Sequence, residues 1–192
     1  AVTMYLQDND YKMADCTRTN RFLWYQSGNS GSFRKTDDND AYWGVAYKDY
    51  IKNPKVFGCP SFAKVATLIY SQDPEAIKTS AFSLNNYANN KKTTDVRHHA
   101  EFIVTHDHAE PKIEQGSRDM FHNDGPGTMN LTHYRQGGGR SDFYHGIFRH
   151  NIRSGEPFKT GGRANMLWLD GHVTRLEETT GDDVPERWYT GE

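Results

Sequence analysis

The chain has 192 residues, of which 23 are Lys or Arg and 25 are Asp or Glu, so its formal net charge is −2. This balance argues against the dense basic face that binds nucleic acid, and the length predicts a single domain, residues 1–192. Only 35% of the residues are hydrophobic and the mean hydropathy is −0.89. No run approaches the roughly 20 consecutive apolar residues that cross a bilayer.

Aromatic side chains dominate the apolar residues, with 10 Phe, 11 Tyr and 4 Trp. Gly, Asp and Asn, which favour turns, are also abundant. We therefore expect an aromatic core and long ordered loops on a modest sheet, and not a helical bundle. Rings in Asp- and Asn-rich segments are either part of this core or exposed platforms for sugars, and the scarcity of aliphatic residues favours the core. They are Trp24, Tyr42, Trp43, Tyr134 and Trp188.

The first eight residues have a helical pattern. Val2, Tyr5 and Leu6 lie on one stripe, and no N-cap residue precedes them. A helix normally begins with such a cap. We therefore expect residues 1–8 to be the last turns of a longer N-terminal helix.

A strand and a second helix are expected next. The aromatic run at residues 21–25 predicts a strand. The acidic run at residues 37–40 offers N-caps for a helix over residues 41–51, and Pro54 ends it because the residue before a proline avoids the α region.

The middle of the chain shows weaker patterns. Residues 79–87 and 95–104 have the composition of strands, whereas residues 65–70 fit either a strand or a helical turn. Residues 105–150 show little periodicity and are far longer than an ordinary loop. We expect them to form a loop-rich insertion.

The C-terminal part predicts a β-hairpin over residues 164–177. Two alternating runs flank Asp170-Gly171, a pair that favours a type I′ turn. Both faces of the first run are apolar, so this strand should lie inside a sheet. Asp170 is expected to accept a hydrogen bond from a residue near His150 or Asn165.

Three segments in this order resemble one family: YLQDND near the start, VFGCPS after the second helix, and RHN followed by RANMLWLDGHV. They are similar to bacterial pseudopilin-like, prepilin-type secreted proteins with a C-terminal His…Asp-Gly processing-associated signature. In that family a cleavable leader and a long hydrophobic helix precede a globular head. Here the His stands 20 positions before the Asp, so residues 152–162 look like an insertion.

The resemblance implies an α+β, pilin-like fold in which the helix remnant packs on a mainly antiparallel sheet with long ordered loops. It also implies a bacterial, extracellular or cell-surface structural subunit that associates with itself into a filament, related to type IV pili and type II secretion. Contact with a membrane would be made only through the missing N-terminal helix. The family motif is expected to have a structural role, and its residues here are His150, Asn165, Asp170, Gly171 and His172.

The two cysteines, Cys16 and Cys59, are either a disulfide or two free buried thiols. The extracellular location that the resemblance implies favours the disulfide, because oxidised pairs persist outside the cytoplasm.

The insertion contains oxygen ligands that suit calcium, as in the C-terminal loops of secretion pseudopilins. The alternative is a loop held by Asx-turns and by ion pairs with Arg118 or Arg135. His106 and His108, two apart on a strand, can ligate one ion, but no zinc motif is present. The candidate calcium ligands are Asp107, Glu110, Asp119, Asn123 and Asp124.

No nucleophile elbow, phosphate loop or framed carboxylate pair is found in the sequence. We therefore expect no enzymatic activity and no certain cofactor, calcium being the candidate. The main hypothesis is a structural subunit. The alternatives are a cell-surface carbohydrate-binding module and a metal-dependent hydrolase.

Overall fold

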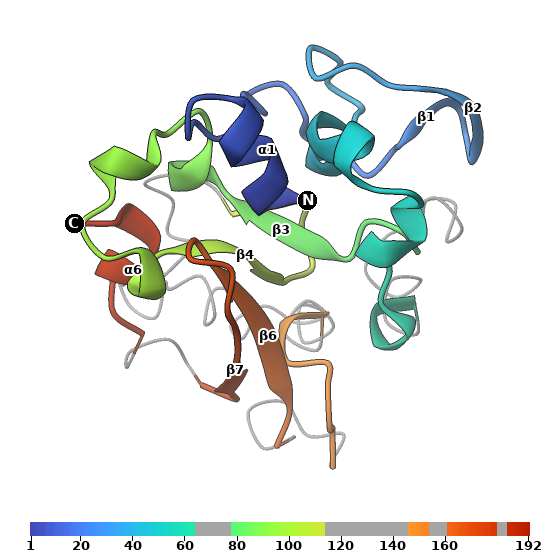
Figure 1. The fold of residues 1–192 in the computed structure, drawn as a ribbon. Coiled ribbons are helices and arrows are strands. Elements are labelled where there is room, and N and C mark those ends of the chain that lie inside the picture. Colours follow the sequence, from blue (N-terminus) through green and yellow to red (C-terminus); the bar gives the residue numbers. More distant parts are fainter. Residues whose placement is uncertain (64–77, 114–145, 154–160, 180–183) are drawn as a thin grey trace.

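The structure, a computed structural model, describes residues 1–63, 78–113, 146–153, 161–179 and 184–192. These residues form a mixture of short helices and two sheets, so the predicted α+β class is confirmed (Figure 1). The elements are α1 Val2–Asp8, β1 Tyr25–Ser27, β2 Ser30–Phe33, η1 Trp43–Tyr50, η2 Pro54–Phe57, β3 Phe82–Asn85, η3 Asn86–Ala88, η4 Thr93–Asp95, η5 His99–Glu101, β4 Ile103–Asp107, β5 Lys112–Ile113, β6 Arg163–Trp168, β7 Val173–Glu177 and α6 Arg187–Thr190, where η marks a 3-10 helix.

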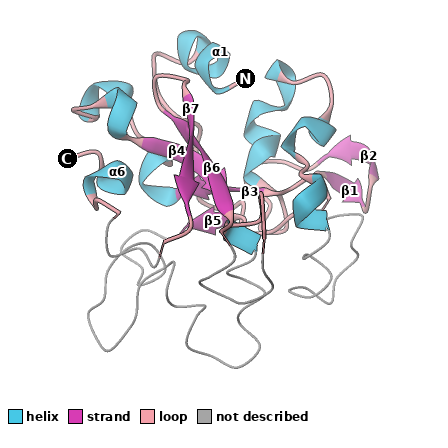
Figure 2. Cartoon of the chain, turned by 90° about the horizontal axis from the view of Figure 1, so that it is seen from below, coloured by secondary structure: helices cyan, strands magenta, loops and turns pink. Residues whose placement is uncertain are grey.

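The main sheet has five strands in the order β5-β3-β4-β6-β7. All neighbours are antiparallel except β3 and β5, so the sheet is mainly antiparallel, as predicted. β6 lies between β4 and β7, which confirms that the strand with two apolar faces is an interior strand. The β1–β2 ribbon stands apart from this sheet in both views (Figures 1 and 2).

Hydrophobic clusters cover both faces of the sheet because neighbouring residues of a strand point to opposite sides. Val104 of β4 joins Leu84 and Leu6 in one cluster with Trp43. The next residue toward the N-terminus, Ile103, belongs to a second cluster. The other main members of that second cluster are Met166, Trp168, Ile147, Phe148 and Tyr189.

Helix α1 packs through the stripe seen in the sequence. Leu6 is buried, and Val2 and Tyr5 are half-buried against the first cluster. The Tyr5 ring makes an edge contact with Tyr47 of η1 at a centroid distance of 4.9 Å. Within the ranges that the structure describes, no helix combines the length and hydrophobicity that a bilayer crossing requires.

Three of the five singled-out aromatic residues belong to the core. Trp24, Tyr42 and Trp43 are each at most 2% exposed. Their polar atoms are also satisfied: Trp24 Nε1 donates to the Thr79 carbonyl at 2.8 Å, and Tyr42 and Trp43 both donate to the Phe82 carbonyl. Such pairing is what a buried ring with a polar end requires. Trp188 packs half-buried against Trp168, and Tyr134 lies outside the described residues.

The N-terminal expectations for residues 21–25 and 41–51 are only partly correct. The first strand begins at Tyr25, and Leu23 makes only an isolated bridge to Ala41. The expected helix is the shorter 3-10 helix Trp43–Tyr50. It contains Gly and bulky aromatic residues, which are weak α-helix formers. Gly44 is also pressed against Trp24, whose ring would lie 2.4 Å from an added Cβ.

The strand expected over residues 95–104 is wrong except at its end. Two 3-10 turns, η4 and η5, interrupt that stretch, the Arg97 amide between them donates to the Gly191 carbonyl, and only its last two residues belong to β4, which starts at Ile103. β3 takes the central part of residues 79–87. Residues 105–107 complete β4 instead of starting an insertion. Residues 65–70 and 114–145 lie outside the described residues.

The C-terminal hairpin is confirmed, but its turn differs from the expected type. β6 and β7 pair antiparallel, with Leu167 opposite Val173. The Gly171 amide donates to the Trp168 carbonyl at 3.0 Å, and only Gly171 has a positive φ, +93°. A type I′ turn needs two such residues. The connection is therefore a three-residue loop with its left-handed residue at Gly171.

Replacing Gly171 by Val is expected to lower the free energy of unfolding by about 1–3 kcal/mol, because a β-branched residue is strained at this φ. An added Cβ meets nothing closer than Thr3 Oγ1 at 3.7 Å, so backbone strain is the cause. Urea unfolding of G171V measures the loss. G171N is the matched control and should lose less, because Asn tolerates positive φ better. Equal stability of G171V and the unmodified chain would contradict the turn assignment.

Residues 187–191 are attached to the centre of the sheet. The buried Asn85 side chain donates to the Ile103 carbonyl at 2.8 Å and to the Tyr189 carbonyl at 2.9 Å. Lys91 Nζ donates to the Thr190 carbonyl at 3.0 Å. Tyr189 is completely buried. The end of the described chain is thus part of the second cluster.

Candidate functional site

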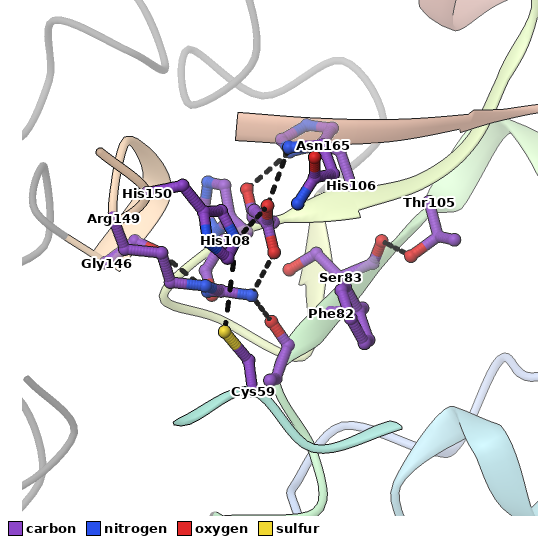
Figure 3. A network of polar contacts seen from close by, with 12 residues as sticks. Cys59, Phe82, Ser83, Thr105, His106, His108, Gly146, Arg149, His150 and Asn165 are labelled. Atoms are coloured by element: carbon purple, nitrogen blue, oxygen red, sulfur yellow. Dashed lines mark hydrogen bonds and ion pairs between the residues drawn. The ribbon is translucent and has the colours of Figure 1, made fainter. Parts of the chain in front are cut away.

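Three residues from separate segments meet at one end of the sheet: Cys59, Asp107 and His150. Figure 3 shows Cys59 and His150 of this group beside Arg149. Cys59 follows η2, and Asp107 is the last residue of β4. His150 forms a bridge with Arg163 at the start of β6, with backbone hydrogen bonds of 3.1 and 2.8 Å. Because β4 and β6 are neighbours, this bridge places His150 beside Asp107. One ligand atom from each of the three residues lies within 4.8 Å of the other two.

Asp107 is completely buried and has a partner for each carboxylate oxygen. Oδ1 accepts a hydrogen bond from Arg149 Nη2. Oδ2 accepts a hydrogen bond from the backbone N–H of Asn165 at 2.6 Å and lies 3.0 Å from His150 Nε2. Burial alone would raise the pKa of Asp107, but the Arg149 charge and the contacts of His150 and Asn165 outweigh it and hold this pKa below its usual value. The carboxylate is therefore ionised at neutral pH.

Arg149 is held as firmly as the carboxylate it pairs with. Its side chain has no exposed surface, and its guanidinium donates to the carbonyls of His108, Gly146 and Ala81. The guanidinium carbon also lies 4.9 Å from the centre of the Phe62 ring. Residues of four chain segments thus fix this cation and, through it, the orientation of Asp107.

His150 points the same ring nitrogen at both other members of the site. Nε2 lies 3.0 Å from Asp107 Oδ2 and 3.9 Å from Cys59 Sγ. A Cys–His–Asp relay needs one ring nitrogen for the nucleophile and the other for the carboxylate. This geometry is not that relay, whereas three ligand atoms facing a common point suit a metal ion.

The motif residues expected to act together are divided between the two ends of the hairpin. His150 and Asn165 lie at Asp107, as described above. Asp170, Gly171 and His172 form the turn at the other end of β6, where Asp170 Oδ1 is 2.5 Å from His172 Nδ1 and 3.1 Å from the His172 amide. The expected bond from Asp170 to a residue near His150 or Asn165 is thus wrong, because the length of β6 separates them.

The two cysteines are free thiols and do not form the expected disulfide. They lie in different hydrophobic clusters. Cys16 Sγ donates to the Trp43 carbonyl at 3.7 Å, whereas Cys59 faces His150. Burial raises the pKa of the Cys16 thiol to about 12, so this cysteine stays protonated and unreactive.

Only two of the five expected calcium ligands, Asp107 and Glu110, lie in the described residues, so the calcium site stays a prediction. Asp107 is bound by Arg149, and the Glu110 backbone contacts Ser83 and His108. Asp119, Asn123 and Asp124 lie outside the described residues.

His106 and His108 lie close together, with ring centroids 5.5 Å apart, but His106 has other partners. Its Nδ1 is 2.7 Å from the Asp107 carbonyl oxygen, and its Nε2 is 3.2 Å from the Tyr189 hydroxyl. Burial lowers the pKa of His106 to about 4, so its ring is neutral and both nitrogens are occupied.

Sequence reasoning missed Arg149 and the joint role of Cys59, Asp107 and His150. Cys59 was expected to pair with Cys16, and Asp107 was assigned to calcium. The signal in the sequence was the RHN segment, which places the cation Arg149 next to the imidazole of His150. The structure shows that Arg149 is buried.

Comparison of the chain with family models, curated proteins and solved structures found no match.

Proposed function

We propose that this chain is the head of a secreted, pseudopilin-like structural subunit that associates with itself into a pilus-like filament or surface assembly. Two features support the proposal. Three segments of the sequence resemble that family in the same order, and the N-terminal helix α1 packs through η1 against an α+β head with a mainly antiparallel sheet.

The observation that carries the proposal is an apolar groove where α1 begins. The groove has a volume of about 830 Å³. The residues that line it include the start of α1, Leu167 of β6 and Val173 of β7. Ile51, Val56, Phe57 and Phe82 add further apolar surface.

Large apolar side chains are exposed at this groove. Val56 is 65% exposed and Val173 is 63% exposed, and both line it. Met4, on α1 but not among the residues that line the groove, is 55% exposed. Exposed apolar surface around a groove marks sites of protein association. With a net charge of only −2, two copies of the chain repel each other weakly, so a second copy is the partner that we propose.

Replacing Val173 by Glu is expected to weaken self-association about tenfold or more, because it places a charge on the surface that a second copy would bury. Sedimentation velocity over a range of concentrations measures this, and electron microscopy of the native material shows whether the chain repeats in a filament. I152E is the matched control, since Ile152 is 43% exposed but does not line the groove. A chain that stays monomeric at every concentration, in material without filaments, contradicts the proposal.

A further inference from the structure

The donor set at Cys59, Asp107 and His150 is one thiolate sulfur, one carboxylate oxygen and one imidazole nitrogen. These are the three ligand types that zinc takes in proteins, at about 2.3 Å for sulfur and about 2.0–2.2 Å for nitrogen and oxygen. Tetrahedral angles at such bond lengths put neighbouring ligand atoms about 3.3–3.6 Å apart. The distances here are 3.0 Å from nitrogen to oxygen and 3.9 Å from nitrogen to sulfur, and no two of the three ligand atoms are more than 4.8 Å apart, so seating an ion requires the Cys59 sulfur to move toward the other two atoms.

Hydrogen bonds alone do not account for the way His150 faces both Asp107 and Cys59. His150 Nε2 carries at most one proton, which the charged Oδ2 atom of Asp107 attracts more strongly than sulfur does. The 3.9 Å contact to Cys59 Sγ is then a poor one. A cation at the common point would instead contact all three atoms at once.

The surroundings prepare the carboxylate to act as a ligand. Arg149 donates to Oδ1, and the backbone N–H of Asn165 donates to Oδ2. The second lone pair of Oδ2 remains for a ligand on the side of His150 and Cys59. Such outer contacts orient ligands in metal sites. A thiolate and a carboxylate would supply two negative charges to a divalent cation, and Arg149 shares the carboxylate through Oδ1.

The site has a route to solvent. The His150 side chain is 32% exposed, and Cys59 lines a pocket of about 450 Å³ together with Trp24, Asn53 and Lys78. An ion can therefore enter without unfolding of the described part of the chain.

We propose that Cys59, Asp107 and His150 bind one thiophilic divalent cation, zinc, with water completing the tetrahedron. The sulfur ligand favours zinc over calcium or magnesium, which need several hard oxygen ligands. Cys59 loses its proton on binding, and the proton passes to solvent. This site is separate from the apolar groove, and the proposal does not depend on self-association.

Cobalt(II) and zinc titrations of the reduced full chain test the site. We expect one equivalent of cobalt to give a thiolate charge-transfer band and tetrahedral visible bands, and one equivalent of zinc to abolish them. Bound zinc should also protect one thiol from alkylation, and a chelator should restore its reactivity.

Matched variants locate the ligands. C59S should lose the charge-transfer band, and H150Q should bind the metal at least about tenfold more weakly, because each removes a ligand. C16S is the control and should keep the band, since Cys16 lies in another cluster. Circular dichroism confirms that each variant is folded. A folded wild-type chain that binds no equivalent of either metal, or a C59S band equal to that of wild type, would overturn the proposal.

Discussion

Replacing Arg149 by Met is expected to lower the free energy of unfolding by about 3–5 kcal/mol. The change leaves the Asp107 carboxylate buried without its main compensating charge, and removing one partner of a buried ion pair typically costs this much. It also removes the donors to the carbonyls of Ala81, Gly146 and His108. Urea unfolding measures the difference in unfolding free energy, and the m-values of R149M and the unmodified chain should be equal.

The control for this prediction is R34M. Arg34 also pairs with an aspartate, Asp38, at 2.6 Å, but the Asp38 side chain is 31% exposed. A pair near solvent contributes about 0–1 kcal/mol. The double variant R149M/D107N should be more stable than the sum of its two single changes predicts, because no uncompensated charge is left. A loss below about 1 kcal/mol in R149M would show that the buried pair does not stabilise the fold.

The second large effect is acid destabilisation through His106. The folded chain holds the pKa of this buried histidine at about 4, against an ordinary value of 6.5. Between those two pH values the unfolded chain binds a proton that the folded chain does not, so stability falls as the pH falls. The full stability is present above pH 6.5, and about 3 kcal/mol of it is lost as the pH approaches 4.

Urea unfolding from pH 7 to pH 4 measures this loss, and H106Q should show a shallower decline because Gln does not titrate. Carboxylates also contribute to acid unfolding, so the informative quantity is the difference between the two curves. H98Q, a change at an exposed histidine, should leave the decline as it is in the unmodified chain. Parallel curves for H106Q and the unmodified chain would mean that His106 is not the group responsible.

Local sequence patterns predicted the elements that depend on neighbouring residues. The stripe in residues 1–8 and the two runs around Asp170-Gly171 can be recognised from neighbouring residues alone. The helix and the hairpin that they predict are both confirmed. Only the end of the strand expected over residues 95–104 is correct, since β4 starts at Ile103, and the rest includes a distant contact that a local pattern does not contain, the bond from the Arg97 amide to the Gly191 carbonyl. The turn type failed because only Gly171 takes a positive φ.

Local patterns could not predict the candidate site, because its residues are also far apart in the sequence. Cys59 and His150 are 91 positions apart, and they meet only because β3, β4 and β6 pair in one register. The 20 positions between His150 and Asp170 suggested an insertion, whereas the His150–Arg163 bridge accounts for the position of His150 in space. A pattern search by spacing cannot find ligands that a sheet brings together.

The attachment of residues 187–191 has a consequence for the order of folding. Asn85, in the middle of the chain, reaches its second carbonyl partner only when Tyr189 is in place, and these two residues are 104 positions apart. The five-stranded sheet likewise needs β6 and β7, which are synthesised late. Contacts of such long sequence separation make folding slow. During translation Phe148 and Trp168 of the second cluster therefore lack Tyr189 as a packing partner until that residue has left the ribosome.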